Sequence, residues 1–193
     1  TDAAWQEALK PNKGADRRRD VYLDRDDRRS LLSGADGEVA PFVRALCLLP
    51  LRPGAIAGLR VRDFEPRTRT LTIGKDKNGR PRQIAVPPEV AEFLKQHCAA
   101  KLGEAFLFTR SNGAAWDKDA WKGPIKNAVV AAKLPIAVSA YTLRHSVITD
   151  LIREGVPALI VAQLSGTSVS MIERHYGHLV RNDAEAALSR LAI

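Results

Sequence analysis

The chain is 193 residues long and 45% hydrophobic, which is enough for one globular domain with a core of its own. Its 30 basic and 22 acidic residues give a net charge of +8, and such a surface favours a polyanionic partner such as nucleic acid. No stretch is long and apolar enough to cross a membrane, no secretion signal opens the chain, and no internal repeat is present.

The N-terminal part divides into a predicted tail and the start of a domain. Residues 1–20 carry a proline, a glycine and a run of three arginines, and we expect them to form a tail or linker. Residues 21–193 are expected to form one domain. Asp24 suits the N-cap of its first helix, because its carboxylate can accept hydrogen bonds from the free amides of the first turn.

Two further helices are predicted before residue 60. Apolar residues at helical spacing predict a helix over residues 38–49, which Pro50 ends. Within it, Cys47 lies in an apolar run that predicts a buried thiol. A chain with only two cysteines also fits a reducing, cytoplasmic compartment. Pro53 suits the first turn of a short helix that runs to Leu59.

A β-hairpin is predicted in the middle of the chain, and helices after it. Strands are expected around Leu71–Ile73 and Ile84–Val86, where apolar and polar residues alternate, and Asn78-Gly79 between them is a strong turn signal. The remaining segments indicate helices over residues 88–101, 117–133, 141–154, 157–165, 168–177 and 182–192. The expected fold class is α+β, mainly α-helical with a small antiparallel β-sheet.

Arg52 is the first candidate for chemistry. It precedes Pro53 and is therefore expected at a helix N-terminus, where free backbone amides and a partial positive charge suit an anion. Its guanidinium can bind a phosphate through two parallel hydrogen bonds. Taken alone, the residue favours an ordinary surface arginine.

Tyr141 and Arg144 are the second candidates. They lie three residues apart in a predicted helix and so face the same way, while Leu143 and Val147 face the core. Arg144 is expected to emerge beside the phenol as a site for an oxyanion. The alternative is a packed aromatic next to a solvated arginine. His145 is expected to pack or to support the site rather than to catalyse.

Tyr176 is the third candidate. Gly166 is predicted to end one helix and Thr167 or Ser168 to cap the next, which places Tyr176 at the far end with Gly177 as its stop. This position would present the phenol rather than bury it. A packing residue of an amphipathic helix is the alternative.

The order of these residues resembles the catalytic set of the tyrosine recombinases, the phage integrase family. Leu51–Arg60 is similar to the family's first arginine box, and Thr142–Ser146 is similar to the second. The spacing from Gly166–Ser168 to the tyrosine resembles that between the third active-site position and the nucleophile. Lys75, in the predicted hairpin, matches the catalytic lysine, although Lys77 is close enough to compete. The resemblance covers residues 21–192 and implies the tyrosine recombinase catalytic-domain fold.

The resemblance implies site-specific DNA recombination or integration, in which a strand is cleaved and rejoined through a 3′-phosphotyrosyl intermediate. The two arginines would neutralise the phosphate oxygens, as a divalent metal does elsewhere, and the tyrosine would attack phosphorus. Lys75 would protonate the leaving oxygen. No cofactor and no metal ion are expected. The implied catalytic set is Arg52, Lys75, Tyr141, Arg144, Thr167 and Tyr176.

Three positions depart from the family pattern. The second box opens with Tyr141 instead of histidine, the third carries Thr167 instead of histidine or tryptophan, and the first has Ala55 instead of an acidic residue. Both hydroxyls can donate to a phosphate oxygen, but neither titrates near neutral pH as imidazole does. We expect an active, slowed enzyme. The alternative is a catalytically impaired, prophage-derived DNA-binding module.

Two other classes were weighed against this one. A type IB topoisomerase shares the chemistry and differs in its substrate. An RNA-binding domain lacks support, because the sequence has no aromatic-rich sheet motif on which bases would stack.

The resemblance also implies the partners. The expected partner is double-stranded DNA with attachment sites, on which the family acts as a homotetramer, while the chain alone is compatible with a monomer. The family's N-terminal core-binding domain has no counterpart in this sequence, so weak DNA binding is expected. A bacterial cytoplasmic protein at the nucleoid is expected, with no membrane partner. Further DNA contacts are predicted from Lys77, Arg80, Arg82, Lys118, Lys122, His175 and His178.

Overall fold

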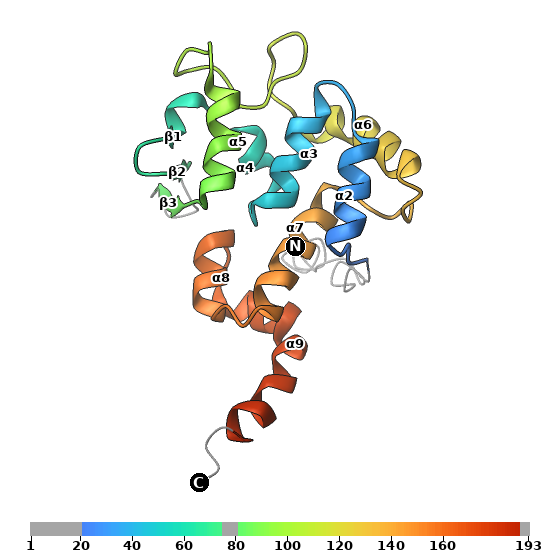
Figure 1. The fold of residues 1–193 in the computed structure, drawn as a ribbon, viewed down its shortest axis with the longest axis vertical. Coiled ribbons are helices and arrows are strands. Elements are labelled where there is room, and N and C mark those ends of the chain that lie inside the picture. The colour runs from blue at the N-terminus through green and yellow to red at the C-terminus, as the bar shows by residue number, and fades with distance from the viewer. Residues whose placement is uncertain (1–20, 75–80, 190–193) are drawn as a thin grey trace, which may run out of the picture.

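The computed structural model of the chain describes residues 21–74 and 81–189, with side chains as far as Leu179. Helices predominate over these residues, and three short strands form one antiparallel sheet, which confirms the predicted fold class (Figure 1). The helices are α2 (Arg25–Gly34), α3 (Val39–Leu48), α4 (Pro53–Ala57), α5 (Pro88–Cys98), α6 (Lys118–Ala131), α7 (Ala140–Arg153), α8 (Ala158–Ser165) and α9 (Val169–Ser189).

The first helices begin and end where the sequence indicates. Asp24 caps α2 by accepting hydrogen bonds from the amides of Asp26 and Asp27, and the Asp27 carboxylate accepts the Asp24 amide in return. Helix α3 ends at Leu48, two residues before the proline that cannot continue it. Cys47 is buried as predicted, and burial raises the pKa of its thiol to about 12, so it stays protonated at neutral pH.

The small sheet has strand order β1-β2-β3, with β1 at Phe64–Glu65, β2 at Thr70–Ile73 and β3 at Arg82–Ala85. Leu71 pairs with Ile84 across β2 and β3, so the predicted strand pair is confirmed. The predicted Asn78-Gly79 turn lies outside the described residues. The sequence did not predict β1 or the 3₁₀ turn before it at Val61–Asp63, because segments of two or three residues carry no measurable periodicity.

Two hydrophobic clusters share α7. The larger cluster fills the space between the sheet and helices α2 to α6, and α7 contributes Leu143 to it. The smaller cluster lies between α7, α8 and α9, and α7 contributes Ile148 and Ile152. In Figure 1, α8 and α9 accordingly lie below the rest of the domain, with α7 between the two parts. Helix α7 therefore fixes α8 and α9 relative to the main core.

Helix α9 continues through Gly177 to Ser189, so the predicted stop at Gly177 and the separate helix over 182–192 are wrong. Tyr176 is 8% exposed and belongs to the smaller cluster, which also contradicts the expectation of a presented phenol. The reason is helical spacing: Val169, Ile172, Tyr176 and Leu179 recur every three or four residues and form the face that packs on α7 and α8. Such packing offsets the roughly 1 kcal/mol that a glycine costs inside a helix.

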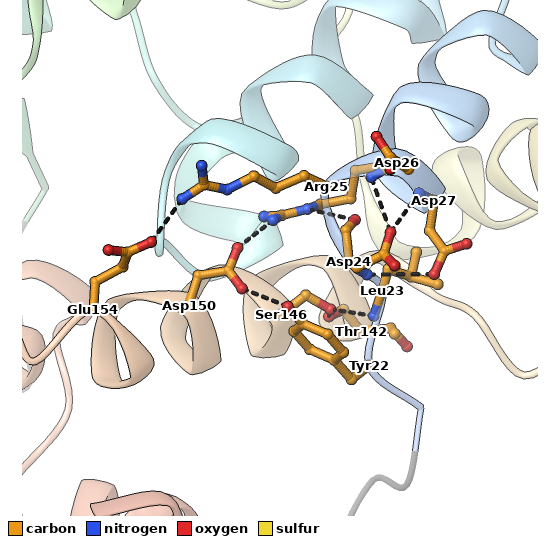
Figure 2. Close-up of polar contacts among 11 residues, drawn as sticks. Tyr22, Leu23, Asp24, Arg25, Asp26, Asp27, Thr142, Ser146, Asp150 and Glu154 are labelled. Atoms are coloured by element: carbon orange, nitrogen blue, oxygen red, sulfur yellow. Dashed lines mark hydrogen bonds and ion pairs between the residues drawn. The ribbon is translucent and has the colours of Figure 1, made fainter. Parts of the chain in front are cut away.

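The start of the domain is tied to α7 by polar contacts (Figure 2). The hydroxyl of Tyr22 donates to the Asp150 carboxylate at 2.7 Å, and the Leu23 amide donates to Ser146 Oγ at 2.9 Å. Arg28, almost fully buried, forms an ion pair with the same Asp150 carboxylate. The segment that leads into α2 is therefore anchored on the helix that also carries Arg144.

Within residues 21–74 and 81–189, every helix is either too short or too polar to cross a lipid bilayer.

Candidate active site

Two arginines meet at the turn between α8 and α9. Nη1 of Arg52 donates to the carbonyl oxygen of Gly166 at 2.8 Å, and Nη1 of Arg144 donates to the carbonyl oxygen of Ser165 at 2.9 Å. Gly166 ends α8 in the left-handed conformation, with φ of +68°, as predicted for a helix C-cap. The same turn leads into α9, whose first turn is capped by Ser168 Oγ.

The loop between α3 and α4 places Arg52. The residue is the N-cap of α4, and Pro53 occupies the first helical position, so the predicted place at a helix N-terminus is confirmed. Leu51 and Pro53 are buried on either side, and this leaves the exposed guanidinium of Arg52 pointing out of the core toward Gly166. Nη1 of Arg144 also donates to the carbonyl oxygen of Pro50 at 2.5 Å. Arg144 thus joins this loop to the end of α8.

Arg144 is buried, at 9% exposure, and does not emerge beside Tyr141 as predicted. The two backbone carbonyls that it binds satisfy the Nη1 end of its guanidinium in the interior. Burial, and next the positive charge of Arg52, lower the pKa of Arg144 to about 10, whereas the phenols of Tyr176 and Tyr141 act in the opposite direction. The guanidinium therefore remains protonated at neutral pH, and its electrostatic neighbours are two other arginines and two phenols.

Arg82 is a third cation at this turn. Its guanidinium lies against Gly166 so closely that a Cβ atom at position 166 would overlap it. The charge of Arg82 also contributes to the lowered pKa of Arg144. The sequence predicted Arg82 only as an outlying DNA contact. Arg82 begins β3, and the pairing of β3 with β2 determines where its side chain points. The sequence alone therefore could not assign Arg82 to the site.

Tyr176 contacts a histidine of α7. Its hydroxyl lies 2.9 Å from Nδ1 of His145, and the two rings stack with their centroids 5.0 Å apart and their planes at 30°. Arg144 precedes His145 in the chain, so α7 presents an arginine and an imidazole to the site from adjacent positions. The sequence predicted His145 to pack or to support the site, and it missed this direct contact with the phenol.

The three positions that depart from the family pattern lie on the same elements as these groups. Tyr141 is 41% exposed in the first turn of α7, one helical turn before Arg144. Thr167 is half-buried directly after Gly166, and its amide donates to the carbonyl oxygen of Ala162 at 3.1 Å. Ala55 lies half-buried in α4, three residues after Arg52. Thr167 thus adjoins the turn that the arginines bind, and Tyr141 and Ala55 each lie three residues from one of those arginines.

The other predicted site residues fall into three groups. Lys75, Lys77 and Arg80 lie outside the described residues. Lys118 and Lys122 are exposed on α6, which packs against α2 and α3 on the opposite side of the domain from α8, and Lys122 forms an ion pair with Asp119 (Figure 1). His175 and His178 flank the tyrosine on α9, half-buried and exposed respectively. None of the side chains described forms part of a group of three or more metal-ligating residues.

We expect Gly166→Ala to lower the free energy of unfolding by about 1–3 kcal/mol, because a β-carbon is strained at φ of +68° and would displace the Arg82 guanidinium. Gly155→Ala is the matched control, since Gly155 has φ of +78° but open space around the position of a Cβ. Both variants should lose stability in urea unfolding, and Gly166→Ala should lose more, because only there would the Cβ atom meet a side chain. Equal losses by the two variants would show that the Arg82 contact is dispensable.

The chain is similar to known proteins in both sequence and structure. It is 26% identical over 141 residues to a tyrosine recombinase of Thermosipho africanus (strain TCF52B), a match that covers 73% of this chain and 50% of the relative. The chain thus spans about half the length of the curated relative that it matches.

Among solved structures, the Tn1549 transposon integrase in complex with a circular intermediate DNA superposes with a TM-score of 0.78 at 19% identity. That match covers 98% of this chain and 74% of the other. The catalytic domain of bacteriophage HP1 integrase gives a TM-score of 0.66 at 20% identity and covers 88% and 94%. At these identities the similarity establishes the fold, which is that of tyrosine recombinase catalytic domains. The sequence profile of the phage integrase family matches residues 30–183, and the chain therefore belongs to the phage integrase family.

Proposed function

We propose that the chain is the catalytic part of a site-specific recombinase that cleaves and rejoins one DNA strand through a 3′-phosphotyrosyl link to Tyr176. The observation that carries the proposal is the meeting of Arg52 and Arg144 at the turn Ser165–Gly166, which leads into the helix of Tyr176. Family membership and fold support the same reaction.

The electrostatic role falls to the two arginines. A phosphodiester resists attack because the incoming oxygen meets negative charge, and that charge spreads over the non-bridging oxygens in the transition state. Burial and next the charge of Arg52 lower the pKa of Arg144, and the two cations repel each other until an anion lies between them. Arg144 is fixed by two carbonyls, and Arg52 is exposed to an incoming phosphate. This preorganised charge supports a reaction that does not depend on a metal ion.

Tyr176 attacks phosphorus in this proposal, and the oxygen that leaves is the 5′ oxygen of the next nucleotide. Lys75 donates the proton to that oxygen, as the resemblance implies. Tyr141 and Thr167 donate hydrogen bonds to the phosphate in place of the histidine, and the histidine or tryptophan, of the family pattern. Rejoining reverses the reaction without ATP, because the phosphotyrosyl link retains the energy of the original phosphodiester.

Double-stranded DNA with attachment sites is the proposed substrate, and a homotetramer on DNA the proposed active assembly. The Tn1549 integrase, whose fold the chain shares, was solved in complex with DNA. Residues 21–193 form the proposed catalytic domain, and in a longer protein a core-binding domain would complete the clamp around DNA. Direct contacts with the backbone of the duplex are proposed for Lys77, Arg80, Lys118, Lys122, His175 and His178.

A covalent trapping assay tests the proposal. The probe is a pool of labelled DNA duplexes of random sequence, each nicked in one strand so that a short product diffuses away and rejoining is prevented. We expect the wild type to form an adduct that survives denaturation, and sequencing of the adducts then identifies a preferred site. Tyr176→Phe should form none, because the variant keeps the packed ring and loses the nucleophilic oxygen.

The binding module is the alternative that the assay distinguishes. Salt-sensitive binding to the duplexes without any adduct from the wild type would contradict the proposal and favour a module that only binds DNA. An adduct that persists in Tyr176→Phe would assign the nucleophile to another residue.

A further inference from the structure

His145 is the imidazole in contact with the proposed nucleophile. Its Nδ1 atom lies 2.9 Å from the hydroxyl of Tyr176, within the reach that a proton acceptor needs. The Tyr176 ring is buried in the smaller cluster, and His145 is half-buried at the edge of that cluster. The polar end of the phenol is thus directed at an imidazole, and stacking of the two rings holds this arrangement.

The reaction requires such a group. A phenol has a pKa of about 10 in water, so Tyr176 has to lose its proton as it attacks phosphorus. Imidazole titrates near neutral pH and is suited to take it. The position where the family pattern has histidine carries Tyr141, and the position where it has histidine or tryptophan carries Thr167. The hydroxyls of these two residues cannot accept a proton in this range.

We propose that His145 is a catalytic residue that accepts the phenolic proton of Tyr176 during cleavage, an inference that rests on the proposed function. The phenolic O–H bond breaks and its proton passes to Nδ1, while the phenolic oxygen forms a bond to phosphorus. The bond between phosphorus and the 5′ oxygen breaks, and that oxygen takes its proton from the separate acid assigned above. In rejoining, the 5′ hydroxyl attacks phosphorus and gives its proton back to that acid, and the imidazolium returns its proton to the departing phenolate.

The fold keeps the two groups in register. Ile148 and Ile152 of α7 pack against the same cluster as Tyr176, so α9 cannot slide along α7 without disrupting that packing. Arg144 adjoins His145 and binds the turn that begins α9. His145, Arg144 and Tyr176 are therefore held in fixed positions relative to one another.

The test compares His145→Gln with the wild type on the duplex recovered from the random pool. Glutamine can still form a hydrogen bond to the phenol but cannot take its proton. We expect adduct formation to be about 10²-fold slower. His97→Gln is the matched control, since His97 is also half-buried and contacts aromatic rings, but lies in α5 against Phe93 and Phe108. It should react at the wild-type rate.

Rescue experiments separate proton transfer from positioning. A fluorinated tyrosine at position 176 has a phenol of lower pKa. It should raise the rate of adduct formation by His145→Gln about tenfold and change the wild-type rate little. A substrate with sulfur as the 5′ leaving atom, which needs no proton, should leave the defect in place. Rescue by the sulfur substrate would mean that His145 protonates the leaving oxygen, and this would overturn the proposal.

The remaining outcomes distinguish this proposal from the proposed function. If the wild type forms an adduct that Tyr176→Phe lacks, and His145→Gln reacts within threefold of the wild-type rate, the role of His145 is wrong and the recombinase stands. If the wild type forms no adduct, both are wrong.

Discussion

Arg144→Lys should reduce the rate of DNA cleavage on the order of 10³-fold while leaving DNA binding nearly unchanged. The guanidinium donates from one nitrogen to the carbonyls of Pro50 and Ser165, and its planar form leaves a second edge for a phosphate. A lysine carries the same charge but is a point donor on a flexible stem. It cannot join the α3–α4 loop to the end of α8 and still stabilise the transition state. Adduct formation in the trapping assay measures the effect.

Arg153→Lys is the matched control for this change. Arg153 lies on the same helix, is exposed, and stacks over the ring of Tyr22 with 4.4 Å between the guanidinium carbon and the ring centroid. The same substitution there should leave the cleavage rate within about twofold, because exposed cation–π contacts contribute little. A cleavage rate of Arg144→Lys within tenfold of the wild-type rate would mean that positive charge alone suffices and that the planar geometry of the guanidinium has no role. A large loss of DNA binding would instead indicate a role in affinity.

Local signals in the sequence predicted the backbone of the site. Pro53, after Arg52, predicted a helix start, and Gly166 predicted a helix end. In the structure, α4 begins at Pro53 and Gly166 is the C-cap that ends α8. These signals are local because each depends on the allowed φ of one residue. The spacing of Tyr141 and Arg144 likewise placed both on α7, as the structure has them.

The burial of the site was not predictable in the same way. Gly177 indicated a helix stop, yet the packing of Ile172 and Tyr176 against α7 and α8 outweighs the preference of one glycine. Whether a side chain such as Arg144 is exposed depends on which backbone carbonyls the fold brings to it, here from residues 94 and 21 positions away in sequence. No local pattern encodes such partners.

The contacts between elements were missed for a related reason. His145 and Tyr176 are 31 residues apart, and their contact depends on how α9 packs across α7. Arg82 reaches the α8–α9 turn only because β3 pairs with β2 in one particular register. In both cases the residue type was visible in the sequence, but its partner was determined by tertiary packing.

Asp150→Ala should lower the free energy of unfolding by about 3–5 kcal/mol, the largest loss of stability that we expect from substituting one partly buried residue. Asp150 is the partner of Arg28, whose side chain is 9% exposed, and it also accepts the Tyr22 hydroxyl. Its removal leaves a buried cation without its carboxylate. For a domain of this size the midpoint of thermal unfolding should fall by about 10 °C, which calorimetry measures.

Glu154→Ala is the control, because Glu154 follows one turn later and pairs with Arg25 at 2.9 Å, but with both side chains more than 60% exposed (Figure 2). Exposed pairs contribute at most about 1 kcal/mol, so equal losses in the two variants would contradict the role of burial. The network lies on α7 but does not touch the phosphate site. Asp150→Ala should therefore cleave DNA at a near-normal rate well below its unfolding temperature and lose activity only as the fold is lost. A cleavage defect in the folded variant would instead show that the anchor at the start of α2 also positions Arg144 and His145.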